Sequence, residues 1–199
     1  KTVTGILSTD NLELIAATPE HLTAELESSG SLASMLNTLV EPGWPPGEYD
    51  RNAQEFFLER LKEGGPDAAG WYTWYAVRRG SQTDHSTLIG AGGYFGPPSS
   101  DGVVEIGFSV MPSWRGHGYA TEIAGKLTEH AFTDSRVKKV IARTVPENIA
   151  SRKVLEKCGF SFVCINEETG HNRFEKRKCG MDMNESGERM TCSDKPPDN

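Results

Sequence analysis

Residues 103–122, VVEIGFSVMPSWRGHGYATE, join a strand-like run to a helix-like run through a glycine-rich turn. The first turn of a helix has four backbone N–H groups without internal partners, and the helix dipole adds partial positive charge, so anions bind there. Glycine at positions 116 and 118 lets a bulky anion such as a diphosphate approach the main chain, and Arg115 can add a positive charge. The turn predicts a phosphate-binding loop, with an ordinary glycine-rich connection as the alternative.

The strand-like run, residues 103–111, alternates apolar side chains with small or polar ones. The apolar side chains share one face of the strand, namely Val104, Ile106, Phe108 and Val110. Glu105 lies on the opposite face with two small residues, Gly107 and Ser109. A carboxylate that faces open space can remove a proton from an ammonium group, directly or through a water. Glu105 is therefore a candidate general base, with a solvated or ion-paired strand residue as the alternative.

Length, composition and charge favour one globular domain that binds no nucleic acid. The chain has 199 residues and a formal net charge of -7, whereas a protein that binds phosphate backbones normally shows a basic face. No apolar run reaches the roughly 20 residues of a membrane span, and the first residues do not resemble a signal peptide. The four cysteines form no C-x-x-C pair, which predicts free thiols in a reducing cytoplasm. The histidines show no metal-ligand spacing, so no metal is predicted.

The rest of the chain predicts an α/β fold. Periodicity places strands at residues 12–16, 71–79, 86–95, 138–145, 160–166 and 173–181, and helices after Thr18, over 32–39, after Asp50, from Ala120 and over 148–157. The strands around the middle of the chain read as an antiparallel meander. We expect a single domain, residues 1–183, with a mixed, mostly antiparallel twisted sheet flanked by helices. Residues 184–199 have little to bury and predict a loosely ordered polar tail.

These segments resemble the GNAT superfamily of acyl-CoA-dependent N-acyltransferases. The pyrophosphate loop of that superfamily has the pattern [RQ]-x-x-G-x-[GA], which Arg115, Gly118 and Ala120 match. The segment EIGFSV and the later NIASRKVLEKCGF, residues 148–160, resemble the Rim-type branch, which includes ribosomal-protein N-terminal acetyltransferases. The resemblance implies that acetyl-CoA, as co-substrate, gives its acetyl group to a primary amine by direct attack in a ternary complex. The acceptor would be a protein or peptide N-terminus or a small-molecule amine, and the chain a monomer or homodimer without a membrane partner.

The resemblance also implies which residues hold acetyl-CoA. The implied cofactor-binding residues are Phe108, Ser109, Val110, Arg115, Gly116, His117, Gly118, Tyr119, Ala120, Asn148 and Ser151. The backbone N–H of Val110 or Ser109 would stabilise the charge that develops on the thioester carbonyl. Asn148 also reads as the N-cap of a helix.

The sequence departs from the family at one position. Many members carry a tyrosine where this chain has Leu155, and that tyrosine protonates the leaving thiolate. Either Ser151 replaces it as a catalytic residue, or the thiolate leaves without a side-chain acid. The departure keeps open a second interpretation, in which the chain is an inactive acyl-CoA-binding or sensing module.

The acceptor site is expected in the parts of the chain that look least like the family. Four aromatic residues could line a slot for an apolar or cationic group next to Glu105, namely Trp44, Tyr49, Trp71 and Trp74. The acidic residues Glu41, Glu48 and Asp50 would help to bind a cationic group. The alternative is that these aromatic side chains belong to the core.

Overall fold

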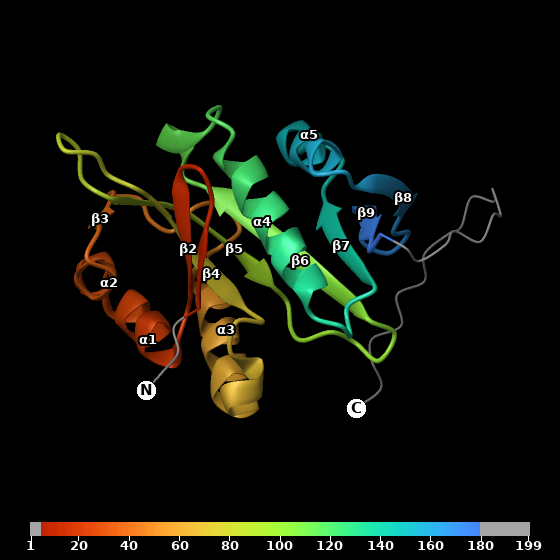
Figure 1. The fold of residues 1–199 in the computed structure, drawn as a ribbon, viewed down its shortest axis with the longest axis horizontal. Coiled ribbons are helices and arrows are strands. Elements are labelled where there is room, and N and C mark those ends of the chain that lie inside the picture. The colour runs from red at the N-terminus through yellow and green to blue at the C-terminus, as the bar shows by residue number, and fades with distance from the viewer. Residues whose placement is uncertain (1–4, 180–199) are drawn as a thin grey trace.

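One sheet of nine strands organises the computed structural model, which describes residues 5–179 (Figure 1). The strand order is β1-β2-β4-β5-β6-β7-β9-β8, and β3 pairs with β5. The strands are β1 Ile6–Ser8, β2 Leu12–Ala16, β3 Leu39–Val40, β4 Thr73–Arg78, β5 Thr87–Tyr94, β6 Val103–Val110, β7 Lys139–Thr144, β8 Ser161–Ile165 and β9 Asn172–Arg177. Among the described strands, β6–β7 and β3–β5 pair in parallel and the other pairs are antiparallel. The predicted single α/β domain with a mixed, mostly antiparallel sheet is confirmed.

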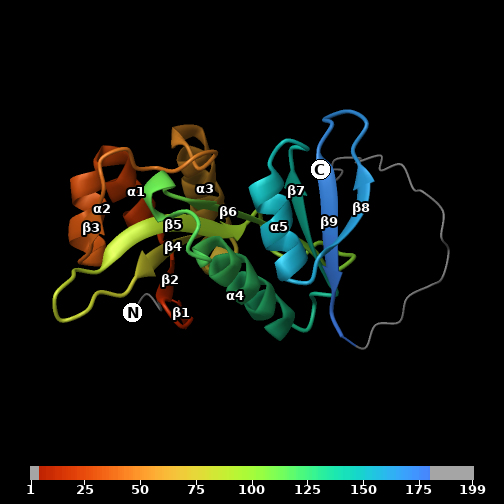
Figure 2. The same cartoon turned by 90° about the horizontal axis from the view of Figure 1, so that it is seen from above.

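Helices cover both faces of the sheet (Figure 2). On one face lie α1 Pro19–Glu27, α2 Ser29–Leu36 and α3 Arg51–Gly64, followed by a short 3-10 turn, η1 Gly65–Ala68. On the other face lie α4 Tyr119–Thr133 and α5 Ile149–Lys157, and a second 3-10 turn, η2 Pro112–Trp114, precedes α4. Each face has its own buried apolar cluster, so the sheet separates two cores.

Capping residues start the helices at the predicted positions. Asp50 accepts a hydrogen bond from the backbone N–H of Ala53 at 2.9 Å, and Asn148 accepts one from the backbone N–H of Ser151 at 3.0 Å. Thr18 caps α1 in the same way. These side chains satisfy N–H groups that a helix cannot pair internally, which is why their sequence positions predict the helix starts.

The helix predicted over residues 32–39 is displaced by three residues, because α2 spans Ser29–Leu36. It ends at Leu36, because Asn37 adopts a left-handed conformation with φ 49°, which asparagine tolerates better than most residues. Leu39 then lies in β3, where it pairs with Thr87. The three-residue strand β1 was also not predicted, since so short a run carries no readable alternation.

Two further predictions concern the cysteines and the end of the chain. Cys158 and Cys179 are free, whereas Cys164 is disulfide-bonded, so the prediction of free thiols is wrong at Cys164. Spacing along the chain does not report which side chains meet in the fold, and the cysteines give no argument for a compartment. The predicted tail, residues 184–199, lies outside the described residues, as do the last residues of the predicted domain. None of the helices in residues 5–179 combines the length and the apolar composition that a membrane span requires.

His21 makes the start of α1 sensitive to pH. Its Nδ1 accepts a hydrogen bond from the backbone N–H of Thr18 at 3.1 Å, and burial lowers the pKa of His21. A histidine whose pKa is lower in the folded state than in the unfolded state stabilises the fold at pH values above the unfolded pKa, near 6.5. This contribution is lost as the pH falls from the unfolded pKa through the folded pKa. We expect the melting temperature to fall by a few degrees between about pH 7.5 and about pH 5.5.

The melting temperature of a His21→Gln variant should fall by less than that of the parent over the same pH range. Glutamine at this position can still accept the N–H of Thr18, as in the common capping box, but it does not titrate. Thermal unfolding of both proteins at the two pH values measures the difference. Equal losses in the two proteins would show that the pH dependence arises elsewhere, for example at His130, whose pKa burial also lowers.

Candidate active site

The strands β6 and β7 separate after a short paired segment, and a cleft opens between them. They pair only where Val103–Glu105 meets residues 139–141. Beyond that point β6 continues to Val110 and β7 to Thr144, each paired with its other neighbour. The cleft measures about 1600 Å³ and is lined by both strands, by the loop before α4 and by α5. The separation therefore provides room for a large ligand within the sheet.

Main-chain amides of β6 face this gap. The N–H of Phe95 donates to the carbonyl of Glu105 at 3.2 Å, so the odd-numbered residues of β6, Ser109 included, direct their backbone groups toward β5. Backbone groups alternate along a strand, and the amides of Phe108 and Val110 consequently point toward the separated β7. This register favours Phe108 and Val110 over Ser109 as donors to a ligand in the gap.

The loop between η2 and α4 has the geometry of an anion-binding turn. Gly116 and Gly118 adopt φ angles of 81° and 84°, and a Cβ at either position would meet no atom within 4 Å. No side chain caps α4, whose first-turn amides start directly after Gly118. Arg115 donates from Nε to the carbonyl of Val110 at 3.0 Å, which ties the loop to the end of β6. The bare backbone and free helix start suit a diphosphate.

The other predicted loop residues divide into two groups. Tyr119 and Ala120 line the cleft together with Arg115. His117 is not among the residues that line it; its Nδ1 lies 3.0 Å from the carbonyl oxygen of Arg115, and its ring stacks on Tyr119 at 5.7 Å. His117 therefore shapes the loop instead of forming the wall of the cleft.

The start of α5 forms the opposite wall. Asn148 and Ser151 both line the cleft, with the amide oxygen of Asn148 engaged as the helix cap. Leu155 follows one turn after Ser151, also borders the cleft and is 1% exposed. An apolar, buried side chain stands where many family members have a tyrosine, so no proton donor lies at that position.

Glu105 borders the cleft on the face opposite the apolar side chains of β6. Its carboxylate forms an ion pair with Arg143 of β7, and the two side chains are 22% and 29% exposed. The ion pair expected under the alternative interpretation is therefore present.

The predicted aromatic wall of the acceptor slot needs correction. Trp44, Tyr49 and Trp74 are all buried, and none is among the described residues that line the cleft. Trp44 donates to Glu25 at 2.7 Å and Tyr49 donates to the same carboxylate at 2.8 Å, while Trp74 donates to the carbonyl of Gly70 at 2.9 Å. Each polar atom is satisfied inside the protein, so these side chains belong to the cores.

Sequence reasoning missed most of the cleft wall on the Glu105 face. This wall comes from four separate segments and includes Gly47, Phe95, Arg143, Thr169, His171 and Arg173. Phe95 is 52% exposed although it is a large apolar residue. Arg143 and Arg173 are cross-strand partners on β7 and β9, a pairing that no local pattern in the sequence indicates.

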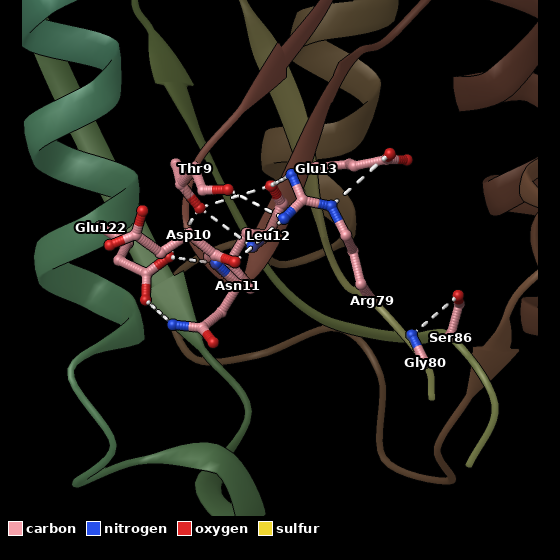
Figure 3. A network of polar contacts seen from close by, with 9 residues as sticks. All are labelled: Thr9, Asp10, Asn11, Leu12, Glu13, Arg79, Gly80, Ser86 and Glu122. Carbon is pink, nitrogen blue, oxygen red and sulfur yellow. Dashed lines mark hydrogen bonds and ion pairs between the residues drawn. The ribbon is translucent and has the colours of Figure 1, made fainter. Parts of the chain in front are cut away.

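A polar network ties the first turn of α4 to the turn between β1 and β2 (Figure 3). Glu122 accepts hydrogen bonds from the side chains of Thr9, at 2.6 Å, and Asn11, at 2.7 Å. Arg79 donates to the carbonyls of Thr9 and Leu12, at 2.9 and 3.0 Å, and so holds the same β1–β2 turn from its other side. The helix start that faces the cleft is thereby anchored to the edge of the sheet.

Comparison with known proteins identifies the class. Residues 12–161 match the model of a family described as the acetyltransferase (GNAT) domain. The match spans most of the chain, which therefore belongs to the GNAT acetyltransferase family. It is an N-acetyltransferase that moves an acetyl group from acetyl-CoA, its co-substrate, to an amine.

Individual relatives agree with this assignment. The uncharacterized N-acetyltransferase YjdG of Bacillus subtilis is 29% identical over 155 residues, which cover 78% of this chain and 89% of that protein. The ribosomal-protein-S5-alanine acetyltransferase of Vibrio fischeri shares the fold with a TM-score of 0.63 and 15% identity, over 90% of this chain and 100% of that one. RimL, a ribosomal L7/L12 α-N-protein acetyltransferase solved with coenzyme A, has a TM-score of 0.59 and 16% identity, over 87% and 98% of the two chains. The structural neighbours thus include Rim-type enzymes.

Proposed function

We propose that the enzyme acetylates a primary amine by direct attack in a ternary complex, with Glu105 as general base. One observation carries the proposal: β6 brings a carboxylate to the cleft wall and, on the same strand, turns the amides of Phe108 and Val110 into the gap. An amine approaching along the Glu105 face would lose a proton to that carboxylate and then attack the thioester carbon. The amides would stabilise the oxyanion that forms.

The distances along β6 between Glu105 and the two candidate oxyanion donors decide whether the amine proton reaches Glu105 directly or through a water. At about 3.4 Å per residue, the Cα atom of Glu105 lies about 10 Å from that of Phe108 and about 17 Å from that of Val110. The side chain of Glu105 spans part of the distance to Phe108, and one water can bridge the remaining gap between the carboxylate and the amine. The distances favour Phe108 as the oxyanion donor over Val110, with proton transfer through a water.

The remaining donor-side residues hold the acetyl-CoA. The first-turn amides of α4, opened by Gly116 and Gly118, would bind its diphosphate, and Asn148 and Ser151 would contact its pantetheine arm. Ser151 is the proposed proton donor to the leaving thiolate, because its hydroxyl-bearing side chain lines the cleft one turn before Leu155. A thiolate also leaves readily without such a donor, so Ser151 contributes less to the rate than Glu105.

The acceptor is proposed to be a peptide or protein N-terminus or a small-molecule amine with an apolar body. We call the part of the cleft on the Glu105 face the acceptor side. Glu48 and Phe95 line it and supply a negative charge and an aromatic surface. We further propose a cytoplasmic enzyme that acts as a monomer or homodimer.

Release of free thiol from acetyl-CoA, measured against a panel of amines and N-terminal peptides, tests the proposed function. We expect acceptor-dependent release with at least one member, and acetylated acceptor detectable by mass spectrometry. Calorimetry with CoA runs in parallel. Binding of CoA without release for any member of the panel would overturn the proposal that the acceptor is a primary amine of these classes.

A further inference from the structure

The segment between β3 and α3, residues 41–50, crosses the end of β6, and we call it the strap. Gly47 passes so close to Ser109 that a Cβ on Gly47 would lie 3.4 Å from the hydroxyl oxygen of Ser109. Gly47 and Glu48 line the cleft at this point. The strap therefore forms part of the acceptor side of the cleft, above the strand that carries Glu105.

A single buried carboxylate holds the strap from beneath. Glu25 of α1 is 6% exposed and accepts four hydrogen bonds: from Trp44 at 2.7 Å, Tyr49 at 2.8 Å, Gln54 at 3.1 Å and Tyr75 at 2.6 Å. Trp44 and Tyr49 belong to the strap, Gln54 to α3 and Tyr75 to β4. Burial raises the pKa of the Glu25 carboxyl, and the four hydrogen bonds oppose that rise.

The carboxylate lies close to the acceptor side of the cleft. Tyr75 pairs with Ala91, and Ala91 pairs with Ser109, so these three residues lie side by side across the sheet. Neighbouring strands are about 4.8 Å apart, which puts the backbone of Tyr75 about 10 Å from that of Ser109. Apolar residues of similar volume often stabilise a core as well as a buried charge does, so stability alone does not account for a glutamate here.

We propose that Glu25 is a positioning residue for the acceptor: by binding Trp44 and Tyr49 it fixes the strap, so that Gly47 and Glu48 form a rigid wall of the acceptor site. The inference rests on the proposed acetyl transfer. Loss of a strap contact to Glu25 should weaken acceptor binding and leave acetyl-CoA binding intact, because the four side chains that donate to Glu25 lie outside the acetyl-CoA loop, residues 115–120.

Two variants provide a matched test. Tyr49→Phe and Tyr75→Phe each remove one hydroxyl donor from the same carboxylate, and both side chains are buried. Only Tyr49 belongs to the strap. Both variants should lower the melting temperature by a similar amount, about 3 to 12 °C. The KM for the acceptor should rise about tenfold in Tyr49→Phe and less than twofold in Tyr75→Phe, while the Kd for acetyl-CoA stays unchanged in both.

A second pair of variants tests Glu25 itself. In Glu25→Gln the amide oxygen can still accept from Trp44, and the amide NH₂ can donate to the hydroxyl oxygen of Tyr49, so the strap keeps its contacts. Glu25→Ala removes them all. The acceptor KM of the Gln variant should lie closer to that of the parent than to that of the Ala variant.

The outcomes separate this inference from the proposed function. Absence of acceptor-dependent turnover in the parent enzyme would overturn the proposed function and, with it, the inference. A parent that turns over, with the same acceptor KM in Tyr49→Phe and Tyr75→Phe, would overturn the inference alone and reduce Glu25 to a structural residue. If Glu25→Ala does not fold, the two tyrosine variants still decide the question.

Discussion

Replacing Glu105 by glutamine should lower turnover by about 10²- to 10⁴-fold and leave the affinity for acetyl-CoA unchanged. Glutamine keeps the shape and hydrogen-bonding capacity of the side chain but cannot accept a proton. An amine with a pKa near 10 is almost fully protonated at neutral pH, so removal of the base slows the attack. Steady-state kinetics and calorimetry with acetyl-CoA measure the two effects separately.

The defect of Glu105→Gln should shrink as the pH rises toward the pKa of the amine, because solvent then deprotonates the acceptor. Glu175→Gln is the matched control. Glu175 also forms ion pairs within the sheet, with Lys139 and Arg173, but it does not line the cleft. Its loss should change turnover by less than about tenfold. Matching pH–rate profiles of Glu105→Gln and the parent from about pH 6 to about pH 10 would show that Glu105 is an ordinary ion-paired strand residue.

Gly118→Asp should abolish measurable binding of CoA, and Gly118→Asn should weaken it far less. Gly118 has a φ angle of 84°, which strains any side chain, and Asn and Asp tolerate this region better than other residues. The two variants therefore carry similar strain and differ in charge. A carboxylate about 4 Å from a phosphate costs roughly 4 kcal/mol at an effective dielectric constant of about 20, or about 10³-fold in affinity.

Calorimetry with CoA, together with circular dichroism to establish folding, checks the Gly118 prediction. The difference between the two variants should also shrink at high salt, because the repulsion acts at a partly exposed site. Equal affinities in Gly118→Asp and Gly118→Asn would mean that the diphosphate does not bind at the start of α4, and the assignment of the loop would fail.

The geometry of the proposed donor side was predictable because its signals are local. The alternation along β6 put Glu105 on the face opposite the apolar residues, and the structure has the same alternation of burial except at Phe108, which is half-buried. The cap at Asn148 and the glycine turn before α4 follow the same logic, since each depends on residues within a few positions of one another. A hydrogen bond between residues a few positions apart can therefore be predicted from the residue types at those positions.

The acceptor side was not predictable, because its contacts join distant segments. Trp44 and Tyr49 are buried because they bind Glu25, which precedes them by 19 and 24 residues. Nothing around either aromatic residue distinguishes a core position from a ligand wall. The ion pair between Glu105 and Arg143, 38 residues apart, depends on how β6 and β7 align, and a one-residue shift would turn the two side chains to opposite faces.

The division of the cleft between one continuous segment and several scattered ones affects how such an enzyme can diversify. The proposed donor half comes from one stretch, from β6 to α5, whose loops and caps would have to stay matched to one unchanging co-substrate. The proposed acceptor half comes from the strap, the end of β5 and the β8–β9 hairpin, which lie outside that stretch of the chain. Insertions and substitutions in these segments would change which amine is accepted and leave the catalytic residues of β6 in place. Substrate specificity could then change during evolution without a change in the acetyl-transfer reaction.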